Sequence, residues 1–129
     1  MKALDTNVLI RYLVRDDLTQ AKAASRFIKS TDEKLLINLI VLCEVVWVLR
    51  AAYGYGRNVI SDVVEKILST EQLVIEDAEV AWKALAEYKI SRSADFSDCV
   101  IGQKNLSLNS EFTVTFDRGL KDLATFKLL

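Results

Sequence analysis

The sequence contains no histidine, and this absence excludes several common kinds of catalytic site. Without an imidazole there is no Ser-His-Asp triad, no histidine-assisted cleavage of RNA and almost none of the usual zinc enzyme centres. The groups that remain for chemistry are carboxylates, hydroxyls, amines and water bound to a metal ion. An active site in this chain is therefore expected to consist mainly of acidic side chains.

Cysteines and long apolar runs are also scarce. Cys43 and Cys99 lie far apart and match no zinc-binding spacing, so we expect two reduced thiols that behave as small buried hydrophobic residues. No apolar run of signal-peptide length precedes the first acidic residue, Asp5. The apolar stretch over residues 35–49 is shorter than a bilayer needs and is interrupted by Glu44. These features predict a cytoplasmic protein without a membrane span.

The size and net charge of the chain indicate its domain organisation but do not decide its kind of partner. Its 129 residues and 51% hydrophobic content predict one domain, 1–129, with a real core. Seventeen basic residues against 18 acidic ones give a net charge of −1, which permits a nucleic-acid partner without indicating one.

Short apolar strands alternate with amphipathic helices along the chain. This alternation predicts an α/β fold, with a parallel sheet covered by helices on both faces. Strands are expected at 2–5, 35–38, 73–75, 112–116 and 126–128, and helices at 8–13, 16–30, 39–53, 58–68, 77–88, 95–106 and 119–123. Thr6 or Asn7 is expected to cap the first helix.

Four acidic residues, Asp5, Glu44, Asp98 and Asp117, stand where apolar segments break off. Burying a carboxylate costs several kcal/mol, about 3–5 when its partner is missing, so such groups need a counter-charge. The carboxyl ends of parallel strands meet at one edge of a sheet, where all four residues are predicted to converge. Oxygen ligands alone favour Mg²⁺ or Mn²⁺. The pattern predicts a metal site.

Each acid also has a plainer interpretation when taken singly. Asp5 could cap a helix, Asp98 could complement a helix dipole in the first turn, and Asp117 could belong to a turn. Glu44 could form a buried pair with Arg50 or Arg92.

Four fragments in a fixed order carry a resemblance to a known family. They are Leu4-Asp5-Thr6-Asn7-Val8-Leu9, Cys43-Glu44-Val45, Ala94-Asp95-Phe96-Ser97-Asp98 followed by Ile101, and Thr113-Val114-Thr115-Phe116-Asp117. Together they resemble the PIN-domain family and, within it, the VapC-type toxins of bacterial toxin–antitoxin pairs. The resemblance spans the whole chain and implies a three-layer fold with a central five-stranded parallel sheet flanked by helices.

The resemblance also implies an activity, a set of site residues and partners. The activity is endonucleolytic cleavage of RNA by water that a bound Mg²⁺ or Mn²⁺ ion activates. The implied RNA substrate is a tRNA or an rRNA. The implied catalytic and metal-binding residues are Asp5, Glu44, Asp98 and Asp117, with Asp95 as a secondary ligand, and Thr6, Asn7 and Thr115 match positions that orient water or phosphate. The implied protein partners are a VapB-like antitoxin and a second copy of the chain.

Other expectations rest on the residues themselves. Arg92 and Arg118 neighbour the predicted acids in sequence, so we expect them to contact RNA phosphates. Two other functions stay open at this stage. One is a non-catalytic PIN-like interaction module, and the other is a metal-dependent phosphatase with an aspartyl nucleophile. Asn7 counts against the phosphatase because such enzymes normally carry an acid two residues after the nucleophile.

Overall fold

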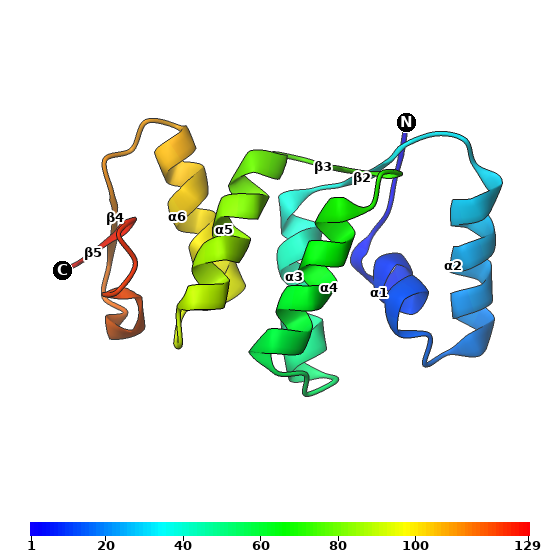
Figure 1. Cartoon of the computed structure of the whole chain (residues 1–129), viewed down its shortest axis with the longest axis horizontal. Coiled ribbons are helices and arrows are strands. Elements are labelled where there is room, and N and C mark those ends of the chain that lie inside the picture. The colour runs from blue at the N-terminus through cyan, green and yellow to red at the C-terminus, as the bar shows by residue number, and fades with distance from the viewer.

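The structure is a computed structural model that describes residues 1–129. Six α-helices and a short 3₁₀ helix alternate with five short strands (Figure 1). The helices are α1 (Thr6–Val14), α2 (Leu18–Ser30), α3 (Leu39–Ala51), α4 (Arg57–Ser69), α5 (Ala78–Ile90), α6 (Phe96–Ser107) and the 3₁₀ helix η1 (Arg118–Leu120). The strands are β1 (Lys2–Ala3), β2 (Leu35–Ile37), β3 (Leu73–Ile75), β4 (Thr113–Thr115) and β5 (Phe126–Leu128). The predicted order of elements is confirmed, with boundaries shifted by a few residues.

Side-chain caps fix the beginnings of three helices. Asp5, Asp17 and Asn38 each accept a hydrogen bond from the backbone N–H three residues later, and so satisfy a donor that the first helical turn leaves free. The prediction that Thr6 or Asn7 caps α1 is therefore wrong. The cap is Asp5, because the helix begins two residues earlier than its apolar periodicity suggested.

All strand pairs are parallel, as predicted, but they form two separate sheets. The first sheet has the order β1-β2-β3, and the second consists of β4 and β5 alone. Lys2 pairs with Leu35, Leu35 pairs with Leu73, and Thr113 pairs with Phe126. The predicted central sheet of five strands is wrong, because no pair joins β1 to β4.

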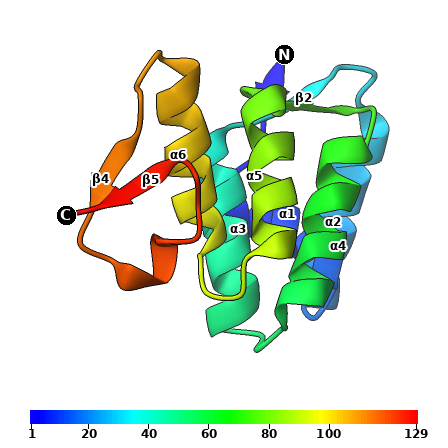
Figure 2. The ribbon, with the colours of Figure 1, turned by 60° about the vertical axis from the view of Figure 1, so that its left-hand side comes forward.

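The packing of the β4–β5 ribbon explains the division. The ribbon lies beside α6 at one end of the molecule, whereas β1 lies near α1 at the other side of α3 (Figures 1 and 2). Gly102 of α6 allows the close approach, since a Cβ at this position would lie 2.3 Å from Thr125 Oγ1 and 2.9 Å from Phe126 Cε2. The local contacts of the ribbon are thus with the preceding helix and not with the first sheet.

One hydrophobic cluster of 27 buried residues connects the helices and the first sheet. The central helix α3 supplies Leu42, Val45 and Leu49, none of which is accessible to solvent. In α2, Ala21, Ala24 and Ile28 are buried in this core, whereas Leu18 is 64% exposed. Leu18 is the first residue of its helix and extends past the core.

Both cysteine side chains are at least partly shielded from solvent and remain free thiols. Burial raises the pKa of the Cys43 thiol to about 11 and that of Cys99 to about 12, and neither forms a disulfide. Both thiols are thus protonated and poorly reactive near neutral pH.

None of the helices has the length and apolarity required to cross a bilayer.

Candidate functional site

The amino terminus of α6 carries two of the predicted acids in a capping arrangement. Asp95 is the N-cap, and its backbone N–H donates to Asp98 Oδ2 at 3.2 Å. Both residues are only partly exposed. The Asp95 carboxylate forms an ion pair with Arg50 of α3. Glu44 is exposed and forms no ion pair with Arg50 or Arg92, so the alternative of a buried pair with either arginine is wrong.

Asp117 reaches the same region from the carboxyl end of β4. Its Oδ1 accepts from Gly119 N at 2.8 Å, while its own N–H donates to Thr115 Oγ1 at 3.0 Å. Ser93 Oγ donates to Gly119 O at 2.6 Å and so ties this turn to the loop before α6. These bonds hold Asp117 beside the α6 amino terminus. Ser93 was missed by sequence reasoning, since a serine in a polar loop gives no signal of its partner.

The charges of Asp95 and Asp117 both act on Asp98. Burial raises the pKa of Asp98, and the charges of Asp95 and Asp117 raise it further. The hydrogen bond from the Asp95 backbone and the Arg50 charge oppose the rise but do not cancel it. We call these three residues the acidic edge. In the folded chain without a bound cation, the ionised form of Asp98 is less favoured than in the unfolded chain.

A stability experiment follows from the raised pKa of Asp98. The folded state holds the Asp98 proton more tightly than the unfolded chain does, so the protonated carboxyl stabilises the fold. This contribution is complete below the pKa that Asp98 has in the unfolded chain, and it is lost as the pH rises through the pKa that Asp98 has in the folded state. At about pH 7 with chelator, Asp98→Asn should raise the free energy of unfolding by no more than about 1 kcal/mol, since the side chain is partly solvated.

Calorimetry at about pH 7 and about pH 3 checks this expectation, because the advantage of the variant should shrink at the lower pH. A variant that melts lower than the wild type at about pH 7 would show that Asp98 acts only as a structural residue of the α6 amino terminus.

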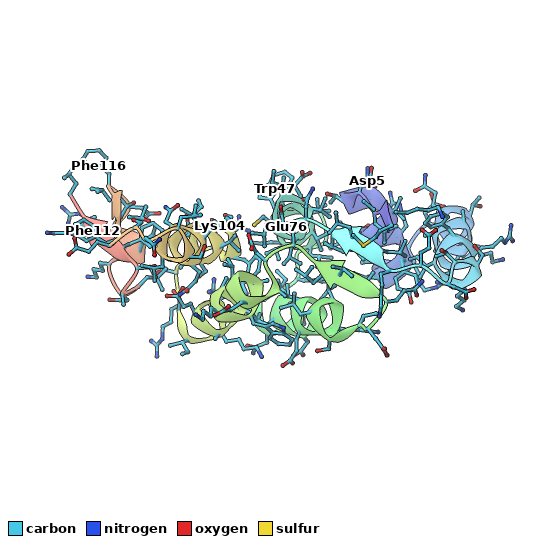
Figure 3. The ribbon with its side chains drawn as sticks, turned by 90° about the horizontal axis from the view of Figure 1, so that it is seen from above. Asp5, Trp47, Glu76, Lys104, Phe112 and Phe116 are labelled. Carbon is cyan, nitrogen blue, oxygen red and sulfur yellow. The ribbon has the colours of Figure 1, made fainter.

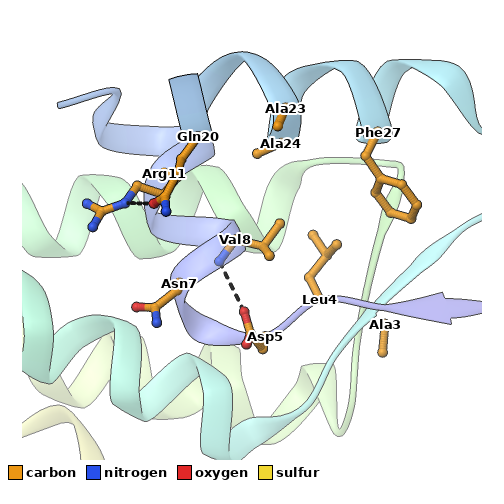
Figure 4. Close-up of a pocket in the computed structure, with 10 residues that line it drawn as sticks. All are labelled: Ala3, Leu4, Asp5, Asn7, Val8, Arg11, Gln20, Ala23, Ala24 and Phe27. Carbon is orange, nitrogen blue, oxygen red and sulfur yellow. Dashed lines mark hydrogen bonds between the residues drawn. The ribbon is translucent and has the colours of Figure 1, made fainter. Parts of the chain in front are cut away.

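Asp5 and Asn7 lie elsewhere, at the rim of a groove beside β1 and α1 (Figure 4). Asp5 Oδ1 accepts from Val8 N at 3.1 Å, and the side chain is exposed. Thr6 is partly buried in the first turn of α1. The structure shows no contact between any of these residues and the acidic edge.

Glu44 occupies the exposed face of α3. It lines a shallow groove of about 460 Å³ between α3 and α6, where Ser97 and Lys104 are also found. Lys104 forms its ion pair with Asp77 and not with Glu44. The expectation that Glu44 interrupts a buried segment is wrong, because α3 turns this position to solvent while its neighbours Val45 and Val46 are buried.

The donor set fits a hard cation in its chemistry, but one copy of the chain does not assemble the whole set. Carboxylate oxygens are the ligands that Mg²⁺ and Mn²⁺ prefer. No group of three or more Asp, Glu or Cys side chains lies close enough in this structure to hold a single metal ion. The acidic edge is therefore a partial site: Glu44 lines the groove that also contains Ser97, the residue before Asp98, and Asp5 lines a different groove.

The basic residues differ in their freedom to meet a ligand. Arg92 and Arg118 are exposed and form no ion pair, which leaves both guanidinium groups free. Arg57 instead donates to the backbone carbonyl oxygens of Ala94 and Tyr88, both at 2.8 Å, and lies over the Tyr88 ring. Arg57 thus fixes the loop that leads into the acidic edge.

Comparison with known proteins adds to this geometry. The sequence model of the PIN-domain family matches residues 2–125 of the chain. Over 126 residues the chain is 30% identical to a VapC ribonuclease of Aquifex aeolicus (strain VF5), an alignment that covers 95% of this chain and 92% of that protein. No solved structure gave a significant match.

Proposed function

Because the chain belongs to the PIN-domain family, we propose that it is a metal-dependent endoribonuclease and the toxin of a VapBC-like toxin–antitoxin pair. The similarity to a VapC ribonuclease over almost the full length of both chains supports the reaction class. The lack of histidine agrees with a hydrolytic route that uses carboxylates.

The observation that carries the proposal is the acidic edge itself. Asp95, Asp98 and Asp117 come from two segments and gather where β4 ends and α6 begins. Burial and the charges of Asp95 and Asp117 raise the pKa of Asp98. A cation bound beside Asp98 would favour its ionised form.

The proposed ligands of Mg²⁺ or Mn²⁺ are Asp98 and Asp117, with Asp95 as a secondary ligand. Asp5 and Glu44 would complete the set, and the segments that carry them would have to move toward the acidic edge to do so. When bound, the ion would supply activation of the attacking water and neutralisation of charge on the phosphoryl oxygens.

Other residues would act on geometry and on substrate binding. The Thr115 hydroxyl accepts the Asp117 N–H, so its role would be to orient Asp117. Thr6 and Asn7 would position water or phosphate from the first turn of α1. The free guanidinium groups of Arg92 and Arg118 would hold RNA phosphates on either side of the acidic edge.

The substrate class would be a structured RNA such as tRNA or rRNA, and the regulatory partner a VapB-like antitoxin. An antitoxin segment would block the site by pairing an arginine with the carboxylates. The Arg50–Asp95 ion pair supports this mode, since it shows that a guanidinium group fits against the acidic edge.

A cleavage assay on the wild-type protein tests the function. Fluorescent single-stranded RNA, single-stranded DNA and a chromogenic phosphomonoester are offered with Mg²⁺ or Mn²⁺, each with and without EDTA. We expect cleavage of RNA alone, lost in EDTA and restored by added metal. RNA cleavage that persists in excess EDTA contradicts the metal requirement, and hydrolysis of the monoester alone would indicate a phosphatase.

A further inference from the structure

The peptide unit between Ala94 and Asp95 forms a hydrogen bond on each of its two sides. Its carbonyl oxygen, Ala94 O, accepts from Arg57 Nη1 at 2.8 Å, and its amide, Asp95 N, donates to Asp98 Oδ2 at 3.2 Å. The unit is trans and planar, so the direction of its C=O group fixes the direction of its N–H group. Arg57 and the Asp98 carboxylate are therefore bonded to opposite sides of one rigid plane.

The carboxyl end of α5 holds Arg57 in place. Arg57 Nη2 donates to Tyr88 O at 2.8 Å, and the centre of the guanidinium group lies 3.9 Å from the centroid of the Tyr88 ring. Tyr88 belongs to the last turn of α5, where carbonyl oxygens have no partner within the helix. Because a guanidinium group presents its donors in a fixed fork, the bond to Tyr88 O also orients the bond to Ala94 O.

Two aromatic rings connect Arg57 with the first turn of α6 by a second route. Tyr88 is 2% exposed and Phe96 is 1% exposed, and their ring centroids lie 5.9 Å apart with the ring planes at 87°. This edge-to-face geometry is favourable for aromatic pairs. Phe96 is the first residue of α6 and stands between Asp95 and Asp98 in the sequence. A shift of the Tyr88 ring would thus also displace the helical turn that carries Asp98.

Arg57 reaches the acidic edge only through these intermediates. α4 and α5 lie side by side, on the face of α3 and α6 that is turned away from Trp47 (Figure 3). Both terminal nitrogens of Arg57 are bonded to backbone carbonyl oxygens, and Ala94, which lies between Arg57 and the acids, is fully buried. The guanidinium group is therefore not offered to a metal ion or to RNA, in contrast to those of Arg92 and Arg118.

We propose that Arg57 is a positioning residue of the metal site. By holding the Ala94–Asp95 peptide unit, it orients the Asp98 carboxylate and increases the affinity of the acidic edge for Mg²⁺ or Mn²⁺. A hydrogen bond to the carbonyl also polarises the peptide unit and strengthens its N–H as a donor to Asp98. The inference rests on the proposed function for the nature of the ion.

Exchange of the Asp95 amide proton, measured by NMR in EDTA, tests the contact without any metal. The variants are Arg57→Ala, which removes all contacts of the side chain, and Arg57→Lys, which keeps the charge but not the planar fork. We expect exchange at least about tenfold faster in Arg57→Ala, with Arg57→Lys in between, because the peptide unit can then turn away from Asp98.

The helix that begins at Arg57 should survive both substitutions. Arg57 is the first residue of α4, where the helix dipole disfavours a positive charge. Alanine is also the best helix former. Amides in the middle of α4 should therefore exchange as in the wild type. If Arg57→Ala does not fold, Arg57→Lys decides by the same comparisons.

Gln72→Ala is the matched control. The Gln72 side chain is also partly buried and joins two backbone carbonyls, since Nε2 donates to Ile28 O at 2.8 Å and to Thr31 O at 3.3 Å. These contacts lie before β3, at the amino end of the first sheet, whereas the acidic edge begins where β4 ends. The control should leave both the exchange of the Asp95 amide and the binding of Mn²⁺ unchanged.

Titration with Mn²⁺, with free Mn²⁺ measured by electron paramagnetic resonance, tests the effect on the metal site. The Kd for Mn²⁺ should rise about 10–100-fold in Arg57→Ala and less in Arg57→Lys, the usual loss when a residue that orients metal ligands is removed. In cleavage assays the deficit should shrink as Mn²⁺ is raised, because Arg57 touches no reacting atom. A residue that only stabilised the fold would lower the melting temperature without changing this Kd.

Two results overturn the inference. One is an unchanged exchange rate of the Asp95 amide in both Arg57 variants, and the other is an equal loss of Mn²⁺ affinity in Gln72→Ala.

The measurements also separate this inference from the proposed function. A wild type that binds Mn²⁺ but cleaves no RNA overturns the nuclease, and the Kd values still test Arg57. A wild type that cleaves RNA while the Arg57 variants keep its Kd and its amide exchange overturns the positioning role alone. A wild type that binds no Mn²⁺ overturns the metal site and with it the proposed effect of Arg57 on affinity.

Discussion

Replacing Asp98 by asparagine should lower the rate of RNA cleavage by at least about 100-fold, with little change in structure. The asparagine keeps the shape of the side chain and one oxygen that can accept from Asp95 N, so the helix start at α6 is preserved. What the substitution removes is one negative charge at the centre of the acidic edge. The loss should fall mainly on kcat, because Asp98 would help to hold the ion that neutralises charge in the transition state.

The measurement is kcat and KM on a fluorescent RNA with saturating Mn²⁺. Asp62→Asn is the matched control, since Asp62 is an exposed acid on α4 with no ion pair. It removes the same charge from the protein and should keep the wild-type rate. Equal effects of the two substitutions would show that net charge, and not the acidic edge, determines cleavage.

Gly102→Ala should lower the free energy of unfolding by about 2–3 kcal/mol. The new Cβ would meet Thr125 Oγ1 at 2.3 Å and Phe126 Cε2 at 2.9 Å, so the ribbon must move away from α6. Alanine gains up to about 1 kcal/mol in helix propensity, which offsets only part of this cost. Urea denaturation checks the expectation.

Gly56→Ala is the control for this substitution. A Cβ at Gly56 meets no atom within 4 Å, and its φ is negative. The control should change stability by less than about 1 kcal/mol, the typical preference for glycine over alanine at a helix start. Equal stability of the two variants would mean that the ribbon does not pack against α6 in solution.

The sequence by itself determined the secondary structure well. Apolar residues at intervals of three and four placed the helices, and short β-branched or leucine-rich runs placed all five strands. Such signals are local, because each depends on residues within one or two turns. The predicted boundaries were wrong where a single side chain determines where a helix begins. Asp5 is an example, because it caps α1 and the helix begins two residues earlier than predicted.

The acidic edge was predictable in part for the same reason. Asp95 and Asp98 share one helical turn, and Asp117 follows a strand, so their places in local structure could be read from sequence. The residues that pair with these acids could not be predicted from sequence. Arg50 lies 45 residues from Asp95, and the Ser93–Gly119 bond spans 26 residues. No periodic pattern encodes such contacts.

Only the tertiary structure decided how the two sheets are related and where Asp5 and Glu44 stand. A sequence pattern shows that a strand is apolar, but it does not show which edge the strand pairs with, since backbone hydrogen bonds are alike for all residues. Gly102 lets β5 settle on α6, and α3 turns Glu44 to solvent while burying its neighbours. Local chemistry fixed the elements, and long-range packing fixed which of the acids can meet within one chain.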